Sequence, residues 1–293
     1  MDTRHLLIFG LGYTGTAIAA LAAGQGWQVT ATSRDPGRLR PPAGVTLIPF
    51  DGAGPAVLAA THLVQTAAPA DGGDPALARY GTEVAAAPHL RWAGYLSTTG
   101  VYGDRDGGWV DEDTPPAPTG DRGRWRIAAE DAWAAACTRC AVDVFRVAGI
   151  YGPGRSAFDD LRAGAARRVL KPGHLFGRIH RDDIAAAVLA AMAQDRPLGR
   201  RVLNLADDEP AASADVTAEA AQLLGLEPPP LVPYADALPG MGAMARSFWA
   251  ENRRVRSAKT QAALGLRWAY PTYHEGLRAI LQQVAAERPA QQR

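Results

Sequence analysis

The sequence is poor in cysteine and lysine, and neither charge is in excess. Cys137 and Cys140 are the only cysteines, in a lone CTRC, and no second pair of ligands has the spacing of a zinc site. Lys171 and Lys259 are the only lysines, yet 31 basic residues balance 30 acidic ones, for a net charge of +1. This balance gives no electrostatic basis for binding nucleic acid or an anionic membrane. We therefore expect no metal site and no nucleic-acid partner.

Long hydrophobic runs are also missing. No stretch is long and apolar enough to span a bilayer, and MDTRHLLIFGLG lacks the long apolar core and the cleavage site of a signal peptide. With 47% hydrophobic and 21% charged residues, the 293-residue chain has the composition of a globular protein with a substantial core. We expect a soluble, cytoplasmic protein without membrane contact.

Short apolar runs alternate with helical segments through the first half of the chain. Such runs, separated by helices, predict buried parallel strands, and parallel strands need crossover connections. The sequence therefore predicts an α/β fold with a doubly wound parallel sheet. The predicted strands are LLIFG, WQVTATSR, VTLIPF, THLVQTA, RWAGYLST and VDVFRVAGIYG.

The pattern changes after residue 155. DDLRAGAARRVL (159–170) and DDIAAAVLAAMAQD (182–195) are predicted helices, whereas the proline-rich stretch 227–240 is a predicted irregular loop. We expect residues 1–155 to form a dinucleotide-binding domain that is completed by about 174–207. Residues 156–173 and 208–293 should form mainly a smaller substrate lobe and a closing helix.

A glycine-rich loop follows the first predicted strand. FGLGYTG places Gly10, Gly12 and Gly15 in the pattern GxGxxG, directly before an alanine-rich helix. The first glycine allows a tight turn, the second lets the backbone approach a pyrophosphate, and the third lets helix and strand pack closely. Tyr13 and Thr14 lie at the helix N-terminus, which favours negative charge. This loop predicts a dinucleotide site, and a turn without a ligand is the alternative.

The end of the second strand indicates which dinucleotide is preferred. Ser33 and Arg34 stand where an NAD-preferring site would carry an acidic residue. An arginine can neutralise a 2′-phosphate, and a serine can donate a hydrogen bond to it. We therefore predict NADP, while NAD stays possible because Asp35 could serve as the ribose acceptor.

Further cofactor contacts are predicted after the third and fourth strands. Asp51 could accept a hydrogen bond from the adenine amino group, or it could be an ordinary turn aspartate. The fourth strand ends in small residues that let a cofactor ribose lie close. These residues are Ala67, Ala68 and Pro69.

With these motifs in place, the chain resembles the extended short-chain dehydrogenase/reductase family, the NAD-dependent epimerase/dehydratase group with a Rossmann-type sheet, and in particular its atypical members. The resemblance covers residues 6 to about 280 and rests on FGLGYTG, LSTTGVYGD, FRVAGIYGPGR, RIHRDDIA, VLNLADDEP and LGLRWAYPTYHEGL. It implies that Thr98, after the fifth strand, orients a substrate hydroxyl. A strand-end hydroxyl that only satisfies the backbone is the alternative.

The family's catalytic tyrosine and lysine are absent. Arg122 and Arg126 stand at their positions, in RGRWR. Because arginine stays charged at physiological pH, Arg122 cannot act as an ordinary acid or base, whereas Arg126 could still bind the ribose. Tyr102 is the nearest candidate proton donor in sequence, although family members with the complete catalytic set also carry this tyrosine.

Basic residues of the second half point to an anionic substrate. The resemblance places RIHRDD near the cleft, and arginine suits a phosphate or a carboxylate. Asp182 and Asp183 are predicted helix caps, and His180 could be structural. The segment around Arg246 could close over a substrate or form a solvated helix face. The candidate substrate-binding residues are Arg155, Arg178, His180 and Arg246.

Together these features predict an NAD(P)-dependent oxidoreductase or epimerase-like enzyme of atypical mechanism, acting on a small anionic substrate. Thr98, Arg126 and Tyr102 are its candidate catalytic residues. A non-catalytic NADP(H)-binding sensor or scaffold is the alternative, since one fold hosts many functions.

Overall fold

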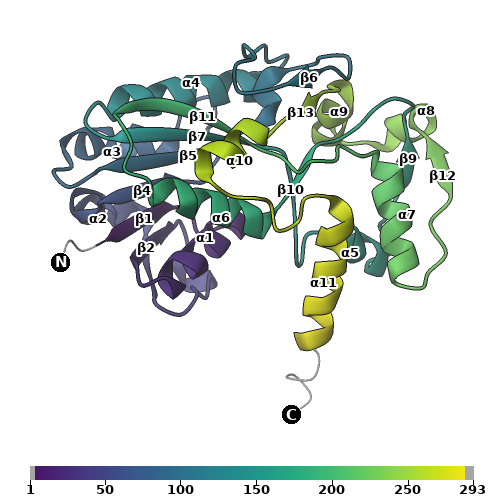
Figure 1. Ribbon diagram of the computed structural model, residues 1–293, viewed down its shortest axis with the longest axis horizontal. Helices are drawn as coiled ribbons and strands as arrows, with labels where there is room; N and C mark the ends of the chain where they lie inside the picture. The colour runs from purple at the N-terminus through teal and green to yellow at the C-terminus, as the bar shows by residue number, and fades with distance from the viewer. Residues whose placement is uncertain (1–3, 288–293) are drawn as a thin grey trace.

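The molecule is built around a seven-stranded sheet in which every pairing is parallel (Figure 1). The computed structural model describes residues 4–287. The strand order is β11-β7-β5-β4-β1-β2-β3, which confirms the predicted doubly wound α/β fold. The strands are β1 (His5–Phe9), β2 (Gln28–Ser33), β3 (Val45–Pro49), β4 (His62–Gln65), β5 (Trp92–Thr98), β7 (Ala141–Val147) and β11 (Gly199–Leu205).

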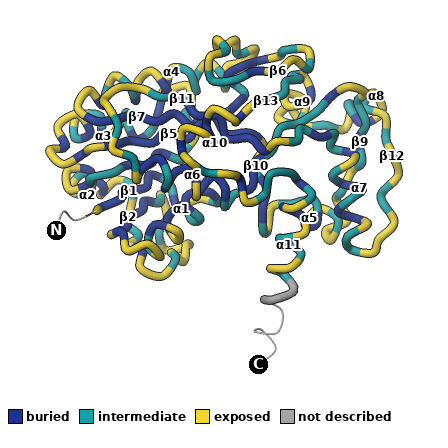
Figure 2. Tube along the Cα trace, in the orientation of Figure 1, coloured by how far each residue is buried: buried dark blue, intermediate teal, exposed yellow. Residues whose placement is uncertain are grey.

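Alternate residues of the central strands pack against helices on opposite faces of the sheet. On β1, Leu6 and Ile8 belong to one buried cluster, and Leu7 and Phe9 belong to the other. The strand is apolar throughout because both of its faces are covered. Burial of each such side chain contributes about 1.5–3 kcal/mol. Figure 2 shows these strands as a continuous buried layer.

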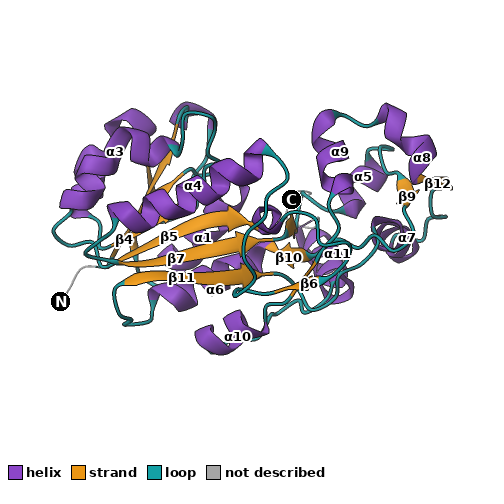
Figure 3. Cartoon of the chain, turned by 90° about the horizontal axis from the view of Figure 1, so that it is seen from above, coloured by secondary structure: helices purple, strands orange, loops and turns teal. Residues whose placement is uncertain are grey.

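Five helices cover the two faces of the sheet. The first cluster includes α1 (Tyr13–Gly24) and α6 (Arg181–Met192). The second includes α2 (Gly54–Ala59), α3 (Pro75–Ala86) and α4 (Asp121–Ala136). Figure 3 shows α3 and α4 along one side of the sheet and α6 along the other.

The strand order reverses between β1 and β4, and this reversal positions the site. From β1 the chain runs outward to β2 and β3, and it then crosses back to β4 on the other side of β1. At such a switch point the loops that follow two neighbouring strands diverge and leave a crevice at the carboxyl ends of the strands. The glycine loop follows β1, and Thr66 follows β4.

A smaller lobe stands beside the sheet (Figure 1). It contains two short parallel pairs, β8 with β10 and β9 with β12. Its core includes Phe158, Leu277 and Ile280. The lobe elements are β8 (Gly149–Tyr151), α5 (Ala157–Arg162), β9 (Arg168–Leu170), β10 (Arg178–His180), α7 (Ser213–Leu223), β12 (Leu231–Pro233), α8 (Tyr234–Ala237), α9 (Ala243–Ala250) and α11 (Tyr273–Glu287).

Part of the range 208–293, predicted to be mainly lobe, returns to the sheet. There β13 (Arg254–Val255) pairs with β6 (Trp109–Val110), and α10 (Ala258–Leu264) packs against β11 and α6. The last residues of that range, 288–293, lie outside the described part. None of the described helices is long and apolar enough to cross a membrane.

Three local predictions were wrong. The helix predicted over 159–170 ends at Arg162, because Gly164 adopts a φ of +66° and residues 168–170 pair with β12 instead. For the same reason the predicted loop 227–240 contains β12 and α8. Asp183 is not a helix cap: its carboxylate accepts hydrogen bonds from Ala269 N (2.7 Å) and Tyr270 N (3.0 Å).

Candidate active site

A pocket of about 220 Å³ lies at the carboxyl ends of the central strands. It brings the first turn of α1 together with Thr66 after β4, with the end of β5, and with the start of the lobe. Of the residues predicted from the sequence, six line it. They are Gly12, Tyr13, Thr14, Gly15, Arg126 and Arg155.

The glycine loop has the geometry that a phosphate site requires. Gly10 adopts a φ of +95°, and a Cβ atom there would lie 2.8 Å from Thr66 Oγ1. A Cβ atom on Gly15 would lie 2.3 Å from the carbonyl oxygen of Gly10, so only glycine fits. Nothing surrounds a Cβ atom built on Gly12, and neither a side-chain cap nor an acidic residue occupies the first turn of α1. This helix terminus therefore favours an anion.

Thr32, which the sequence reasoning missed, and Thr66, in the TAAP stretch after the fourth strand, hold the loop in place. Thr32 accepts a hydrogen bond from Gly10 N at its Oγ1 (3.2 Å), and its carbonyl accepts one from Leu11 N (2.9 Å). The Thr66 hydroxyl lies 2.7 Å from Gly10 O and 3.0 Å from Phe9 O, and it donates to these carbonyls. The only signal in the sequence is a threonine at or just after a strand end, and such threonines are common.

Arg34 directly follows β2 and has no polar partner among the described residues. Its side chain is exposed, and within residues 4–287 it forms neither a hydrogen bond nor an ion pair. Asp35 is paired with Arg38 (Nε to Oδ2, 2.8 Å), and its backbone N donates to Ser33 Oγ (3.1 Å). Asp51 lies exposed in a short 3-10 turn at residues 50–52.

The loop after β4 is held by a buried polar pair. Gln65 donates to both carboxylate oxygens of Asp74 at 2.9 Å, and it accepts from Ala67 N (3.0 Å). Ala67, Ala68 and Pro69 do not line the pocket directly.

Arg126 projects from α4 into the pocket, but Arg122 is exposed and does not line it. Arg126 Nη1 donates to Leu96 O (2.7 Å) and to the Tyr95 hydroxyl (3.2 Å). No acidic side chain within residues 4–287 pairs with it. Burial raises the pKa of Tyr95 to about 12, so this hydroxyl stays neutral. The guanidinium group is thus a fixed positive charge at the pocket wall.

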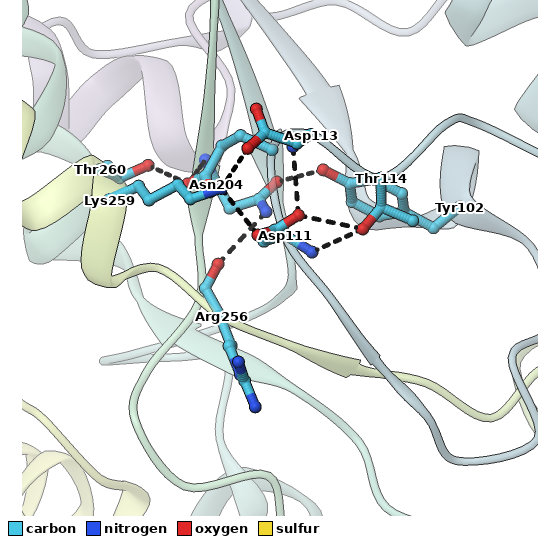
Figure 4. A network of polar contacts seen from close by, with 9 residues as sticks. Tyr102, Asp111, Asp113, Thr114, Asn204, Arg256, Lys259 and Thr260 are labelled. Carbon is cyan, nitrogen blue, oxygen red and sulfur yellow. Dashed lines mark hydrogen bonds and ion pairs between the residues drawn. The ribbon is translucent and has the colours of Figure 1, made fainter.

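The structure argues against Tyr102 as the proton donor. Its side chain is fully buried, and its hydroxyl donates to Asn204 Oδ1 (2.8 Å), as Figure 4 shows. Burial also raises its pKa. The Thr98 hydroxyl is half-buried and accepts a hydrogen bond from Gly100 N (3.1 Å). This contact fits the structural alternative and leaves the hydroxyl hydrogen free to donate.

Ser97, which the sequence reasoning missed, lines the pocket, whereas its neighbour Thr98 does not line it. Its hydroxyl donates to Glu130 Oε1 (2.6 Å). Glu130 in turn pairs with Arg146 (Nη2 to Oε2, 2.8 Å), and both side chains of this ion pair are buried. The network fixes α4, and with it Arg126, against the ends of β5 and β7.

Arg253, which lies far from Thr98 in the sequence, is close to the loop after β5. Its Nη1 donates to Gly103 O (3.0 Å) and Glu251 Oε2 (2.6 Å). A Cβ atom built on Gly100 would lie 3.4 Å from Thr98 Oγ1 and 3.8 Å from Arg253 Nη2. The Thr98 hydroxyl and the Arg253 guanidinium group therefore both lie beside Gly100.

The four predicted substrate residues are not brought together. Arg155 lies at the pocket beside the glycine loop, over the ring of Tyr13 (5.7 Å), whose hydroxyl donates to Pro153 O (3.0 Å). Arg178 lines a different pocket in the lobe. Arg246 is exposed on α9 and donates to carbonyls of its own segment.

The structure also argues against a substrate contact for His180. The residue is fully buried, and burial lowers its pKa to about 4. Its Nδ1 accepts from Asp182 N (3.2 Å), so the ring is neutral and caps α6. Within residues 4–287, no cluster of three or more His, Cys, Asp or Glu side chains could hold a metal ion.

Comparison with known proteins identifies relatives over nearly the whole chain, although no model of a protein family matches it. The solved structure of a conserved protein of unknown function from Silicibacter pomeroyi DSS is 46% identical, with a TM-score of 0.88, over 96% of this chain and 99% of that one. Protein YeeZ of Escherichia coli K12 is 29% identical, over 77% of this chain and 86% of its own length.

More distant solved structures share the fold. A protein from Methylobacillus flagellatus, named as an NAD-dependent epimerase/dehydratase, is 24% identical with a TM-score of 0.73, over 97% of this chain and 100% of that one. MoeE5 in complex with UDP-glucose and NAD is 21% identical (TM-score 0.75; 97% and 99% covered). Human SDR39U1 with NADPH is 20% identical (TM-score 0.73; 95% and 99% covered). The chain thus belongs to one family with the Silicibacter pomeroyi protein, and its fold is that of the extended short-chain dehydrogenases/reductases of the NAD-dependent epimerase/dehydratase type.

Proposed function

We propose that this protein is an oxidoreductase or epimerase-like enzyme. It would bind a nicotinamide dinucleotide as its cofactor in the pocket at the carboxyl ends of the strands. The observation that carries the proposal is that one pocket holds the uncapped first turn of α1 at one side and Ser97 and Arg126 at the other. The NAD and NADPH bound in MoeE5 and human SDR39U1, which share the fold, support the choice of ligand.

The chain's own residues would divide the work of binding. Backbone N–H groups of the first turn of α1 would hold the pyrophosphate, since this terminus carries the positive end of the helix dipole. Arg126 would hold the ribose next to the nicotinamide. When bound, the nicotinamide would supply or accept a hydride.

We infer a preference for NADP. Arg34 is exposed and unpaired, and the neighbouring acid, Asp35, already has Arg38 as its partner. A free guanidinium beside a serine hydroxyl suits a 2′-phosphate, whereas an acid occupied by an arginine is a poorer acceptor for ribose hydroxyls.

The substrate would be a small anion with a hydroxyl or carbonyl carbon. Thr98 would donate its free hydroxyl hydrogen to the substrate oxygen. Arg155 at the pocket would provide fixed positive charge for a carboxylate or phosphate.

The test is NADPH oxidation with a panel of carbonyl compounds that carry a carboxylate or phosphate. We expect turnover with at least one of them, and a loss of about a hundredfold in Thr98→Ala and Arg126→Ala. Arg122→Ala is the matched control on the same helix and should keep full activity. Unchanged turnover in Thr98→Ala and Arg126→Ala would contradict the assignment.

A sensor that binds NADP(H) without chemistry is the second candidate. It is favoured by Tyr102, whose hydroxyl is buried against Asn204, and by Tyr13, the tyrosine that lines the pocket, whose hydroxyl is bonded to Pro153. If NADPH binds tightly and no compound of the panel oxidises it, the sensor is supported over the enzyme.

A further inference from the structure

The small lobe contains a second pocket, of about 190 Å³. It is lined by residues of α5, α7 and α11, of the end of β8 and of the start of β10. Figure 1 shows α5, α7 and α11 lying together in the lobe. Tyr151, Ser213, Thr217 and Tyr273 give it hydroxyl groups, and Arg178 is the basic side chain that lines it.

This lobe pocket is separated from the dinucleotide pocket by β8. Ile150 lines the dinucleotide pocket and the next residue, Tyr151, lines the lobe pocket, because neighbouring residues of a strand point to opposite faces. The following loop alternates in the same way, with Arg155 at one pocket and Ala157 at the other. A ligand of the lobe pocket would therefore be a different molecule from the dinucleotide or its reaction partner.

Arg178 is half-buried and has no ionic partner among the described residues. Its Nη1 donates to the carbonyls of Phe176 (2.8 Å) and Ala211 (2.9 Å), and no acid within residues 4–287 forms an ion pair with it. Burial lowers its pKa, as expected for a cation that has lost water. A half-buried charge without a partner is costly, so the free N–H groups of this guanidinium favour an anion.

Asp207 is the acid whose charge acts most strongly on Arg178, yet within residues 4–287 the two side chains do not form an ion pair. Asp207 is buried, and neither of its carboxylate oxygens has a hydrogen-bond partner in the described residues. Burial raises its pKa to about 8, even though the charge of Arg178 lowers it.

The other walls of the lobe pocket supply hydrogen-bond donors. α7 begins at Ser213 without a side-chain cap, so its first N–H groups face this end of the pocket. Burial raises the pKa of Tyr273 to about 12, which keeps its hydroxyl a donor. Two exposed acids also lie here: Asp160 lines the pocket, and Asp215 is in the first turn of α7.

We propose that the lobe pocket is a binding site for a small anion, a carboxylate or a phosphate group, held by the guanidinium of Arg178 and the first turn of α7, and separate from the dinucleotide site. The planar guanidinium suits either anion through two parallel hydrogen bonds. The site does not depend on the function of the dinucleotide pocket.

The test is calorimetric titration of the full chain with inorganic phosphate and, separately, with succinate. We expect binding of at least one of them, and the tighter ligand identifies the class. Arg178→Met should weaken it by about tenfold or more, because a charge-assisted hydrogen bond is lost. Ala157→Leu should weaken it similarly by filling the pocket while every polar contact is kept.

Arg155→Met is the matched control, since Arg155 lines the dinucleotide pocket instead. It should change the affinity by less than about twofold. Ala157→Leu decides the matter if Arg178→Met fails to fold. The proposal is overturned if neither anion binds the wild-type chain, if Ala157→Leu binds as the wild type does, or if Arg155→Met alone abolishes binding.

Discussion

Arg126 brings a permanent positive charge to the dinucleotide pocket and is held there by the backbone of β5 rather than by an acid. Its charge is therefore left for a ligand. This differs from the tyrosine and lysine pair that the family resemblance implies, because arginine cannot give up a proton at physiological pH. The residue suits binding and charge stabilisation, and the proton must come from another group.

We predict that Arg126→Met weakens NADPH binding by roughly tenfold to a hundredfold, because a charge-assisted hydrogen bond is worth about 1.5–3 kcal/mol. Calorimetric titration measures the change. Arg122→Met, on the exposed side of the same helix, should bind NADPH as the wild type does. Equal affinities in the two variants would show that Arg126 does not touch the cofactor.

Arg34 should decide between the two nicotinamide dinucleotides. Arg34→Ala is expected to reduce NADPH affinity by about tenfold or more while leaving NADH affinity nearly unchanged, because only NADPH carries the 2′-phosphate. Arg40→Ala, another exposed arginine nearby, is the control. A parallel loss of both cofactors in Arg34→Ala would speak against a 2′-phosphate contact.

Asp207 makes folding stability depend on pH. Its usual pKa of 3.8 rises to about 8 in the folded chain, so between these values the folded state binds more protons than the unfolded state. Stability from this group is complete below about pH 4 and is lost as pH rises towards 8, by up to about 1.4 kcal/mol per pH unit.

Asp207→Asn removes this titration, so its stability relative to the wild type should increase from pH 5 to pH 8. Urea unfolding at several pH values measures this difference. His174 and His180, whose pKa values burial lowers to about 4, titrate in both chains and cancel in the comparison. A difference that is flat with pH would mean that Asp207 is ionised in the folded state.

At the scale of elements, the segment that carries Arg253 is fixed to the sheet by Asn204 of β11. Asn204 accepts from the Tyr102 hydroxyl (2.8 Å) and donates to Arg256 O (3.2 Å), as Figure 4 shows. Nearby, Glu112 accepts from Asn204 N and from Thr260 Oγ1 (2.7 Å). The loop after β5 and the segment after α9 are thus joined through one buried amide.

Asn204→Ala should destabilise the protein by about 1–3 kcal/mol, because the Tyr102 hydroxyl would be buried without an acceptor. It should also expose the segment around Arg253 to limited proteolysis. Lys259→Met, which removes an exposed ion pair with Asp111 and Asp113 in the same region, should have little effect on either. If Asn204→Ala has the same free energy of unfolding and the same resistance to protease as the wild type, the amide does not fix this segment.

The elements that could be predicted from the sequence are those whose signals are local. The glycine loop and the strands of the sheet are encoded in short stretches, since GxGxxG and buried apolar runs each act over a few residues. Arg168–Leu170 was misassigned because its strand exists only through pairing with Leu231–Pro233, far along the chain. Asp183 was taken for a cap because its partners, Ala269 and Tyr270, are equally distant.

The same limit applies to the candidate site. Arg126 could be found by its spacing within a motif, but Ser97 and Arg253 could not, because long-range packing of α4 and of the segment after α9 gives them their roles. Arg178 was predicted to bind an anionic substrate, and the structure places it in the lobe pocket. Its sequence position did not show on which side of β8 the side chain would lie.

At the scale of the whole molecule, two pockets share one strand. The dinucleotide pocket lies at the sheet, the lobe pocket lies in the lobe, and β8 forms the wall between them. The chain returns from the lobe to the sheet through β13 and α10, so the two parts are joined at more than one point. Ligands of either pocket should therefore stabilise the whole fold by mass action.

Calorimetric titration of the purified chain with NADPH, and then with NADH, tests the central claim most directly. The account predicts that NADPH binds at one site per chain, more tightly than NADH, and that Arg126→Met weakens the binding. Failure of the wild-type chain to bind either dinucleotide would contradict the account.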